Sequence, residues 1–349
     1  RLTELPPEDQ LSDTEDAETG LVERLDGSHY RDDILRLLFV CCHRDLPATQ
    51  QLALALRIVS GLSVSQIARA FLVSEAAMEQ RITRAKAKVS ASGLPFEAPG
   101  PVERTERLGL VAAMLYLVFN EGYSSTAANA DAGAFCDEAI RLARLLLKLF
   151  PAEPEIMGLL ALMLLQHSRR QARFDTDGAI VLMDHQDRAL WDKAMIGEAL
   201  ALVDKALRHR TPGAYQIQAA IAALHARAPT PEATDWRQIA LLYRVLEGLQ
   251  PSPVVTLNRA VAVAKLDGPA AALAIIEPLE EQLSNYFYFH GVRGGLLKQA
   301  GNTNAARQAF DRAIALANSP AEAAHIRTHL DQLQQDAEKV GLFAPDLSD

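Results

Sequence analysis

The chain has 349 residues, of which 49% are hydrophobic and 23% are charged, and its formal net charge is −9. Such a chain is long and apolar enough to bury the cores of two or three domains. No apolar run approaches the roughly 20 residues that a membrane-spanning helix needs, and no signal peptide is recognisable. We therefore expect a cytoplasmic protein with no membrane partner.

Cysteine use argues against a disulfide framework and against a metal site. Only Cys41, Cys42 and Cys136 are present, which suits a reducing compartment. Cys41, Cys42 and His43 are consecutive, and consecutive helical residues point about 100° apart. They cannot converge on one ion, so no metal is expected.

Charge is distributed unevenly along the chain. Residues 1–33 contain eleven Asp or Glu and three Arg, a net charge of −8, whereas residues 47–90 contain six Lys or Arg and two Glu, a net charge of +4. Residues 1–31 are rich in Pro, Asp and Glu and lack sustained periodicity, which predicts an acidic linker. Because the sequence starts at Arg1 rather than Met, we expect that preceding residues are missing.

From Asp32 onward the sequence predicts an all-α fold. Ala and Leu dominate, and apolar residues recur at spacings of three and four. The segment GLPFEAPGP at 93–101 predicts a linker between a helical module at 32–92 and an intermediate helical segment at 102–209.

Past residue 210 a repeat emerges. Gly268 and Gly301 are 33 residues apart, as are Ala272 and Ala305. That interval fits two helices and two turns, so we expect tetratricopeptide-like repeats at 210–340 and a short tail at 341–349. The aromatic run at 286–289 is expected to pack in the first helix of a repeat.

The stretch GLSVSQIARAFLVSEAAMEQRITRAKAKV, residues 61–89, has the pattern of a helix-turn-helix. Ser63 and Ser74 are suited to cap its two helices. In the second helix Met78, Ile82 and Ala85 share one face at steps of four and three. The polar face opposite them is assigned to the following residues: Glu79, Gln80, Arg81, Arg84 and Lys88. Such a helix fits the major groove of DNA.

The residue types on this helix suit nucleic-acid recognition. Arg can bond guanine, Gln can bond adenine, and Ser74 and Lys88 are suited to phosphates. The local charge of +4 favours DNA as a partner. We place Glu79 at the centre of the polar face, where it counts against DNA binding. An ordinary helical hairpin would show the same capped apolar stripes, so that alternative stays open.

The order G-L-S-x-x-x-I-A followed by S-x-x-x-hydrophobic-x-x-R-I-x-R-A resembles region 4 of the extracytoplasmic-function (ECF) sigma factors of bacterial RNA polymerase. The resemblance implies binding to the promoter −35 element and to core RNA polymerase. It makes Ser74 and Ala77 phosphate-facing, and Gln80, Arg81 and Arg84 readers of bases or backbone. Glu79 and Ala77 stand where that family commonly has a basic residue and a hydroxyl.

Further motifs resemble one ECF subgroup with a tetratricopeptide-like C-terminal extension. They are YLVFNEGY (116–123), DHQDRALWD (184–192), AYQIQAAIAALHA (214–226), TDWRQIALLY (234–243) and PSPVVTLNRAVAVAKLDGP (251–269). The family's region 2 is not found, so we expect this chain to read a −35 element at most. The resemblance also suggests that the acidic linker mimics phosphates in polymerase channels, although it could simply be extended and soluble.

Two of these motifs are candidates for chemistry. They contribute Asn120, Glu121, Tyr123, Asp184, Asp187, Arg188 and Trp191. Paired carboxylates with His185 as proton carrier would suit catalysis, and the apolar surroundings of Glu121 would raise its pKa if it were buried. We favour a structural or ligand-binding role, in which Asn120 and Gly122 end a helix and Asp187 pairs with Arg188 beside Trp191.

Three alternatives to a sigma factor remain open. They are a one-component regulator whose helical tail senses a ligand, a repeat scaffold that no longer binds DNA, and a hydrolase that uses Glu121 and Asp187. No sequence motif for a cofactor is found. The concave face of the repeats is expected to bind a regulatory protein or peptide, or the helix-turn-helix itself.

Overall fold

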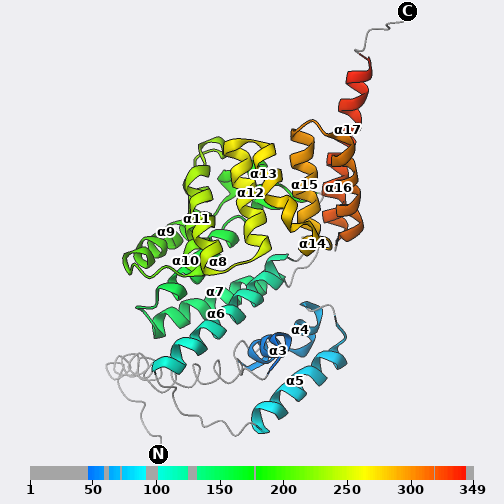
Figure 1. Cartoon of the computed structure of the whole chain (residues 1–349). Helices are drawn as coiled ribbons and strands as arrows, with labels where there is room; N and C mark the ends of the chain where they lie inside the picture. Colours follow the sequence, from blue (N-terminus) through cyan, green and yellow to red (C-terminus); the bar gives the residue numbers. More distant parts are fainter. Residues whose placement is uncertain are drawn as a thin grey trace, which may run out of the picture. The chain divides into compact units, whose positions relative to one another are not determined.

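The computed structural model describes residues 46–58, 63–70, 73–91, 101–124, 132–176, 178–317 and 319–342 (Figure 1). Helices make up almost all of these ranges, and the only β-structure within them is an isolated antiparallel bridge between Phe174 and Ile180. The predicted all-α fold is therefore confirmed. None of the described helices is long and apolar enough to cross a membrane.

The chain divides into two compact units, residues 1–123 with 131–151, and residues 124–130 with 152–349. The predicted acidic linker at 1–31, the Cys41–His43 triplet and most of the predicted linker at 93–101 lie outside the described residues. The domain limits expected from the sequence remain predictions.

Three helices open the first unit: α3 (Ala48–Ile58), α4 (Val64–Ala70) and α5 (Glu75–Ala91). α5 packs against both α3 and α4. Ile67 of α4 and Met78 of α5 are completely buried. The two helices are joined by a short turn in which the amide of Val73 donates to the carbonyl of Ala68 at 3.0 Å. This arrangement is a helix-turn-helix.

The first unit continues with α6 (Pro101–Ser124) and α7 (Ala132–Leu149). Each helix buries an apolar stripe, which includes Leu115 and Phe119 on α6 and Ala139 and Leu146 on α7. The thiol of Cys136 donates to the carbonyl of Phe119 at 3.5 Å and joins the two helices.

The second unit begins with α8 (Pro154–His167), in which every residue from Ile156 to Leu165 is buried. α8 packs against α9 (Lys193–Arg208) and α10 (Ala214–Arg227). A Cβ on Gly158 would lie 2.5 Å from the backbone nitrogen of Gln216, so α8 and α10 approach this closely only because residue 158 has no side chain.

A chain of helices follows, each packed against its neighbour (Figure 1). Its members are α11 (Trp236–Leu249), α12 (Pro253–Asp267), α13 (Pro269–Ile276), α14 (Glu280–Leu283), α15 (Phe287–Gln299), α16 (Thr303–Leu316) and α17 (Pro320–Leu342), with the short 3₁₀ turns η5 (Pro231–Ala233) and η6 (Glu277–Leu279). Their interior falls into separate apolar clusters, one around Ile239, one around Phe289 and one around Phe310. Separate clusters between successive helices are typical of a repeat array.

The spacing of 33 residues corresponds to equivalent turns in this array. Gly268 separates α12 from α13 with φ 85°, and Gly301 precedes α16 with φ 80°, a backbone conformation that favours glycine. Ala272 is completely buried, but Ala306 rather than Ala305 is its buried counterpart on α16.

Candidate nucleic-acid interface

The start of α5 is fixed by local hydrogen bonds. The hydroxyl oxygen of Ser74 accepts a hydrogen bond from the amide of Ala77 at 3.3 Å, which confirms the predicted cap. Glu75 follows in the first turn, where a carboxylate interacts favourably with the helix dipole. The residue that begins the helix is therefore set by the sequence itself.

The inner side of α5 is apolar and the outer side is polar. Met78, Ile82 and Ala85 are 4% exposed or less, as their spacing predicted. Ser74, Gln80, Arg84 and Lys88 are exposed, and Ala77 and Arg81 are half-buried. All six residues predicted to contact DNA therefore retain solvent access in the described structure.

The basic residues form a stripe along α5. With about 100° of rotation per residue, Ala77, Arg81, Arg84 and Lys88 fall within an arc of about 60°. Gln80 lies about 40° beyond Arg84 on the outward side. The stripe follows the helix from its first turn toward its last, and its residues can face one surface together.

Glu79 does not interrupt this stripe. The same rotation places it about 140° from Arg84 and about 180° from Lys88. Its expected position at the centre of the polar face was therefore wrong. The error arose because Glu79 adjoins Gln80 in the sequence, whereas neighbours in a helix point in different directions. Glu79 shares the other flank of α5 with Lys86.

Glu121 and Tyr123 lie near the end of α6 and are half-buried, as is Asn120. α6 continues to Ser124, so the expected helix end at Asn120 and Gly122 was wrong. The ring of Tyr123 stacks on Phe119 of the preceding turn, with 5.6 Å between ring centroids. Burial raises the pKa of the Glu121 carboxyl, in the direction that its apolar surroundings predicted.

Residues 170–192 connect α8 to α9 through three 3₁₀ turns: η2 (Arg170–Ala172), η3 (Met183–His185) and η4 (Arg188–Leu190). The carboxylate of Asp187 accepts from the amide of Ala189 at 2.9 Å and caps η4. The carboxylate of Asp192 accepts from the amide of Met195 at 3.0 Å and caps α9. Both acids therefore begin helical turns.

Arg188 does not pair with Asp187, contrary to expectation. Its Nη1 donates to the carbonyls of His225 at 2.7 Å and Ala228 at 2.9 Å, at the end of α10. Its guanidinium lies over the ring of Trp191, 4.5 Å from the centroid. Trp191 is only 3% exposed. Arg188 thus binds otherwise unpaired helix carbonyls while its charge contacts an aromatic face.

Asp184 forms an ion pair with Lys265 of α12, with 3.0 Å between carboxylate and ammonium. Asp184, His185 and Asp187 are all exposed. Glu121 belongs to the other compact unit. Exposed carboxylates with salt-bridge and capping partners lack the environment that a general acid requires. The described geometry of residues 184–191 suits a structural role.

His225, at the end of α10, has its pKa lowered to about 4, mainly by burial and further by repulsion from Arg169. Its ring meets the edge of Trp236, with 5.2 Å between centroids. An imidazole in this position is neutral near pH 7. It packs as an aromatic side chain beside the Asp184–Lys265 pair.

Comparison with known proteins identifies two regions of the chain. Residues 36–89 match the sigma-70 region 4 family. The chain therefore carries a sigma-70 region 4 domain. This domain belongs to transcription factors and is not an enzyme class. It includes α3, α4 and nearly all of α5.

Residues 107–207 match a family of unknown function, DUF6596. An uncharacterized protein of Rhizobium meliloti (strain 1021) is 70% identical over 334 residues, which cover 95% of this chain and 79% of that protein. The chain belongs to the same family as this rhizobial protein. The DUF6596 match includes both polar motifs, NEGY and DHQDRALWD.

One further polar contact outside the region 4 domain was not predicted from the sequence. The carboxylate of Glu155 on α8 accepts from the amides of Tyr215 and Gln216, both at 3.1 Å, and from Gln216 Nε2 at 3.2 Å. It caps α10, whose own N-cap is Gly213 and offers no side chain. A residue 60 positions away from the helix it caps leaves no local signal in the sequence.

Proposed function

We propose that this protein is a sigma factor of the ECF group that directs RNA polymerase to promoters, with α5 in the major groove of the −35 element. The observation that carries the proposal is the exposed basic stripe of α5, held outward by its buried Met78, Ile82 and Ala85 within a region 4 domain. In this proposal the protein acts in the cytoplasm, with promoter DNA and core RNA polymerase as its partners.

The residues of the stripe have different roles in this proposal. Arg84 and Gln80 project outward and read base edges, as Arg and Gln commonly do. Arg81, Lys88, Ser74 and the backbone at Ala77 contact phosphates and fix the orientation of the helix. Glu79 lies on the flank away from Arg84 and contributes no base contact.

We further propose that the helices after residue 101 form a tetratricopeptide-like extension that regulates transcription or binds a regulatory protein. The packing of successive helices from α11 to α17 supports the likeness to such repeats. Deleting residues 102–349 should change transcription from the chain's target promoter. Unchanged output would contradict a regulatory role for the extension.

Polymerase binding is the decisive experiment. The complete protein should be retained by immobilised core RNA polymerase and should support run-off transcription from a −35-containing template. Tight promoter binding without any retention by polymerase would instead favour a one-component regulator. Absence of both activities would overturn the proposal.

The base-reading role has a matched pair of variants on one helix. Arg84→Ala should reduce promoter affinity by about 1–3 kcal/mol, that of a lost bidentate base contact. Lys86→Ala removes an exposed positive charge from the opposite flank of α5 and should change affinity less than twofold. Equal losses from both variants would mean that α5 does not enter the groove with the proposed face.

A further inference from the structure

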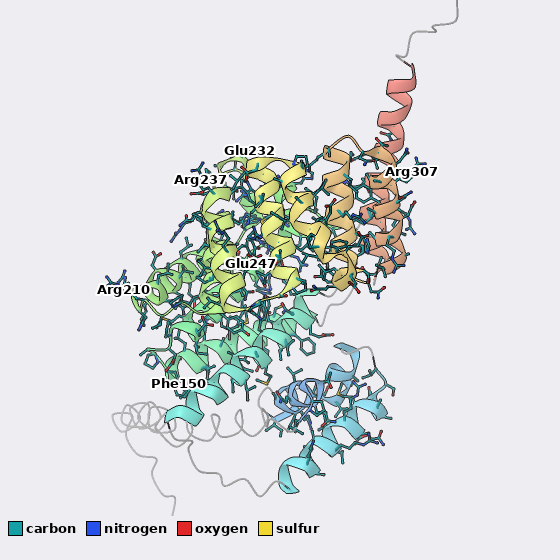
Figure 2. All side chains as sticks on the ribbon, in the orientation of Figure 1. Phe150, Arg210, Glu232, Arg237, Glu247 and Arg307 are labelled. Atoms are coloured by element: carbon teal, nitrogen blue, oxygen red, sulfur yellow. The ribbon has the colours of Figure 1, made fainter. Side chains whose placement is uncertain are left out.

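A groove of about 510 Å³ lies between α11, α12 and α13. α11 lines it with Arg237, Leu241 and Arg244, spaced by four and three residues, so that these side chains share one helix face. α12 lines the facing wall with side chains at the same kind of spacing, namely Arg259, Val263, Leu266 and Asp267. Figure 2 shows Arg237 near the start of α11 and Glu247 near its end.

Apolar side chains are unusually exposed in and beside this groove. Leu241 is 54% exposed, and Val245 and Leu249 follow at steps of four on α11 with 44% and 43%. Leu266 faces the groove from α12 and is 43% exposed. Single exposed leucines are normal, but a continuous stripe of them marks an interaction surface.

The charged residues of the groove favour an acidic partner. Arg259 is held by Glu247, with 2.9 Å between Nε and Oε1, and both side chains are about a quarter exposed. Arg237 and Arg244 are exposed, and neither has an acidic partner among the residues that the structure describes. Two guanidinium groups beside exposed leucines fit a segment that carries both carboxylates and aliphatic side chains.

We propose that this groove binds the acidic segment of the same chain, residues 1–33. That segment has a net charge of −8 and also contains aliphatic residues, namely Leu2, Leu5, Leu11, Leu21, Val22 and Leu25. Because the segment and the groove are covalently linked, binding is intramolecular and benefits from a high effective concentration. The exposed leucines would gain nothing from DNA phosphates, whereas the leucines of residues 1–33 would cover them.

A binding experiment in trans tests the charge complementarity. The receptor is the full chain in which the eleven Asp and Glu residues of 1–33 are replaced by Asn and Gln, which leaves the groove open. The probe is a fluorescein-labelled synthetic peptide of residues 1–33, followed by fluorescence anisotropy. The wild-type peptide should bind this receptor, and its affinity should fall as salt is raised.

Two charge-reversed receptors distinguish the groove from general electrostatic attraction. Arg237→Glu with Arg244→Glu should weaken peptide binding at least tenfold. Arg307→Glu with Arg327→Glu changes the same number of exposed arginines on α16 and α17 and should weaken it less than twofold. Equal effects of the two pairs, or no peptide binding to the unreversed receptor, would overturn the proposal.

Photocross-linking tests the contact within the intact chain. A benzophenone amino acid at Leu266, inside the groove, should cross-link to residues 1–33 of the same molecule, as mapped by mass spectrometry of the monomer. The same amino acid at Leu207 of α9, which is 47% exposed, should not. Cross-links from residue 266 only to other ranges or only between two copies would contradict the proposal. Neither experiment includes DNA or polymerase, so neither depends on promoter recognition.

Discussion

At the scale of single residues, Glu155 has the clearest energetic role. Glu155→Ala would leave the amides of Tyr215 and Gln216 without their acceptor at the start of α10. Loss of a helix cap together with partly buried unpaired donors costs about 1–3 kcal/mol. We expect the free energy of unfolding of the full chain to fall by that amount, as measured by urea denaturation.

Glu153 provides the control for this prediction. It precedes α8, two residues before Glu155, and its side chain makes no capping hydrogen bond. Glu153→Ala should change the unfolding free energy by less than about 0.5 kcal/mol, as surface substitutions usually do. Similar losses for both variants would mean that Glu155 does not stabilise α10.

His225 should make stability depend on pH. Its pKa is about 4 in the folded chain and 6.5 as the reference, so the unfolded chain binds the proton more readily. Stability is therefore lost as pH falls from about 6.5 to 4. Between pH 7 and pH 5 the wild type should lose about 2 kcal/mol more than His225→Gln. His209→Gln, at an exposed position, should behave as the wild type; identical pH profiles for all three would contradict the assignment.

Arg188 shows why some residue roles could not be predicted. The sequence places it beside Asp187 and near Trp191, and the contact with Trp191 was expected correctly. Its partners are instead backbone carbonyls at positions 225 and 228, about one helix and two loops later. Backbone acceptors have no residue type, so no sequence pattern could indicate them. Ser74, by contrast, caps the helix that follows it, and that local bond was predictable.

At the scale of helices, the crossing of α15 and α16 depends on a missing side chain. A Cβ on Gly294 would lie 2.5 Å from Cδ1 of Phe310, which is buried. Gly294→Ala should therefore destabilise the chain by about 1–3 kcal/mol, the usual cost of overpacking, as measured by thermal unfolding.

The neighbouring glycine offers a test of this explanation. A Cβ on Gly295 would meet nothing within 4 Å. Gly295→Ala should be neutral or stabilising by up to about 1 kcal/mol, because alanine favours helices more than glycine does. If both substitutions destabilise equally, helix flexibility rather than the contact with Phe310 controls the effect.

Helix positions were predictable where the signal was local. The glycines 33 residues apart marked equivalent turns because positive φ favours glycine. The aromatic run was correctly expected in a first helix, since Phe287 and Phe289 are buried in α15. The exact buried alanine of α16 was missed by one residue, because helix packing rather than the repeat length determines which side faces inward.

At the scale of the whole molecule, the separation of charge should affect DNA binding. Replacing Glu15, Asp16 and Glu18 with their amides removes repulsion close in sequence to the region 4 domain. Affinity for nonspecific duplex DNA should rise several-fold at about 50 mM salt and by less than about twofold at 300 mM, because screening shortens with salt. Electrophoretic mobility shifts at both salt concentrations would measure this.

Location rather than total charge should decide that result. Amide substitutions at Glu277, Glu281 and Asp311, which are exposed, change the net charge by the same amount. They should raise DNA affinity less than the N-terminal substitutions do. Equal increases would show that only net charge matters. Uneven charge along the chain was evident in the sequence, whereas the groove between α11, α12 and α13 required the packed helices.

The long-range cap made by Glu155 also affects how the second unit opens. Because one carboxylate on α8 accepts both amide protons at the start of α10, those protons become exposed only when the two helices separate. Fraying of α10 alone cannot release them to solvent. Hydrogen exchange at Tyr215 and Gln216 should therefore be as slow as in the centre of α8, although these residues lie in the first turn of their own helix.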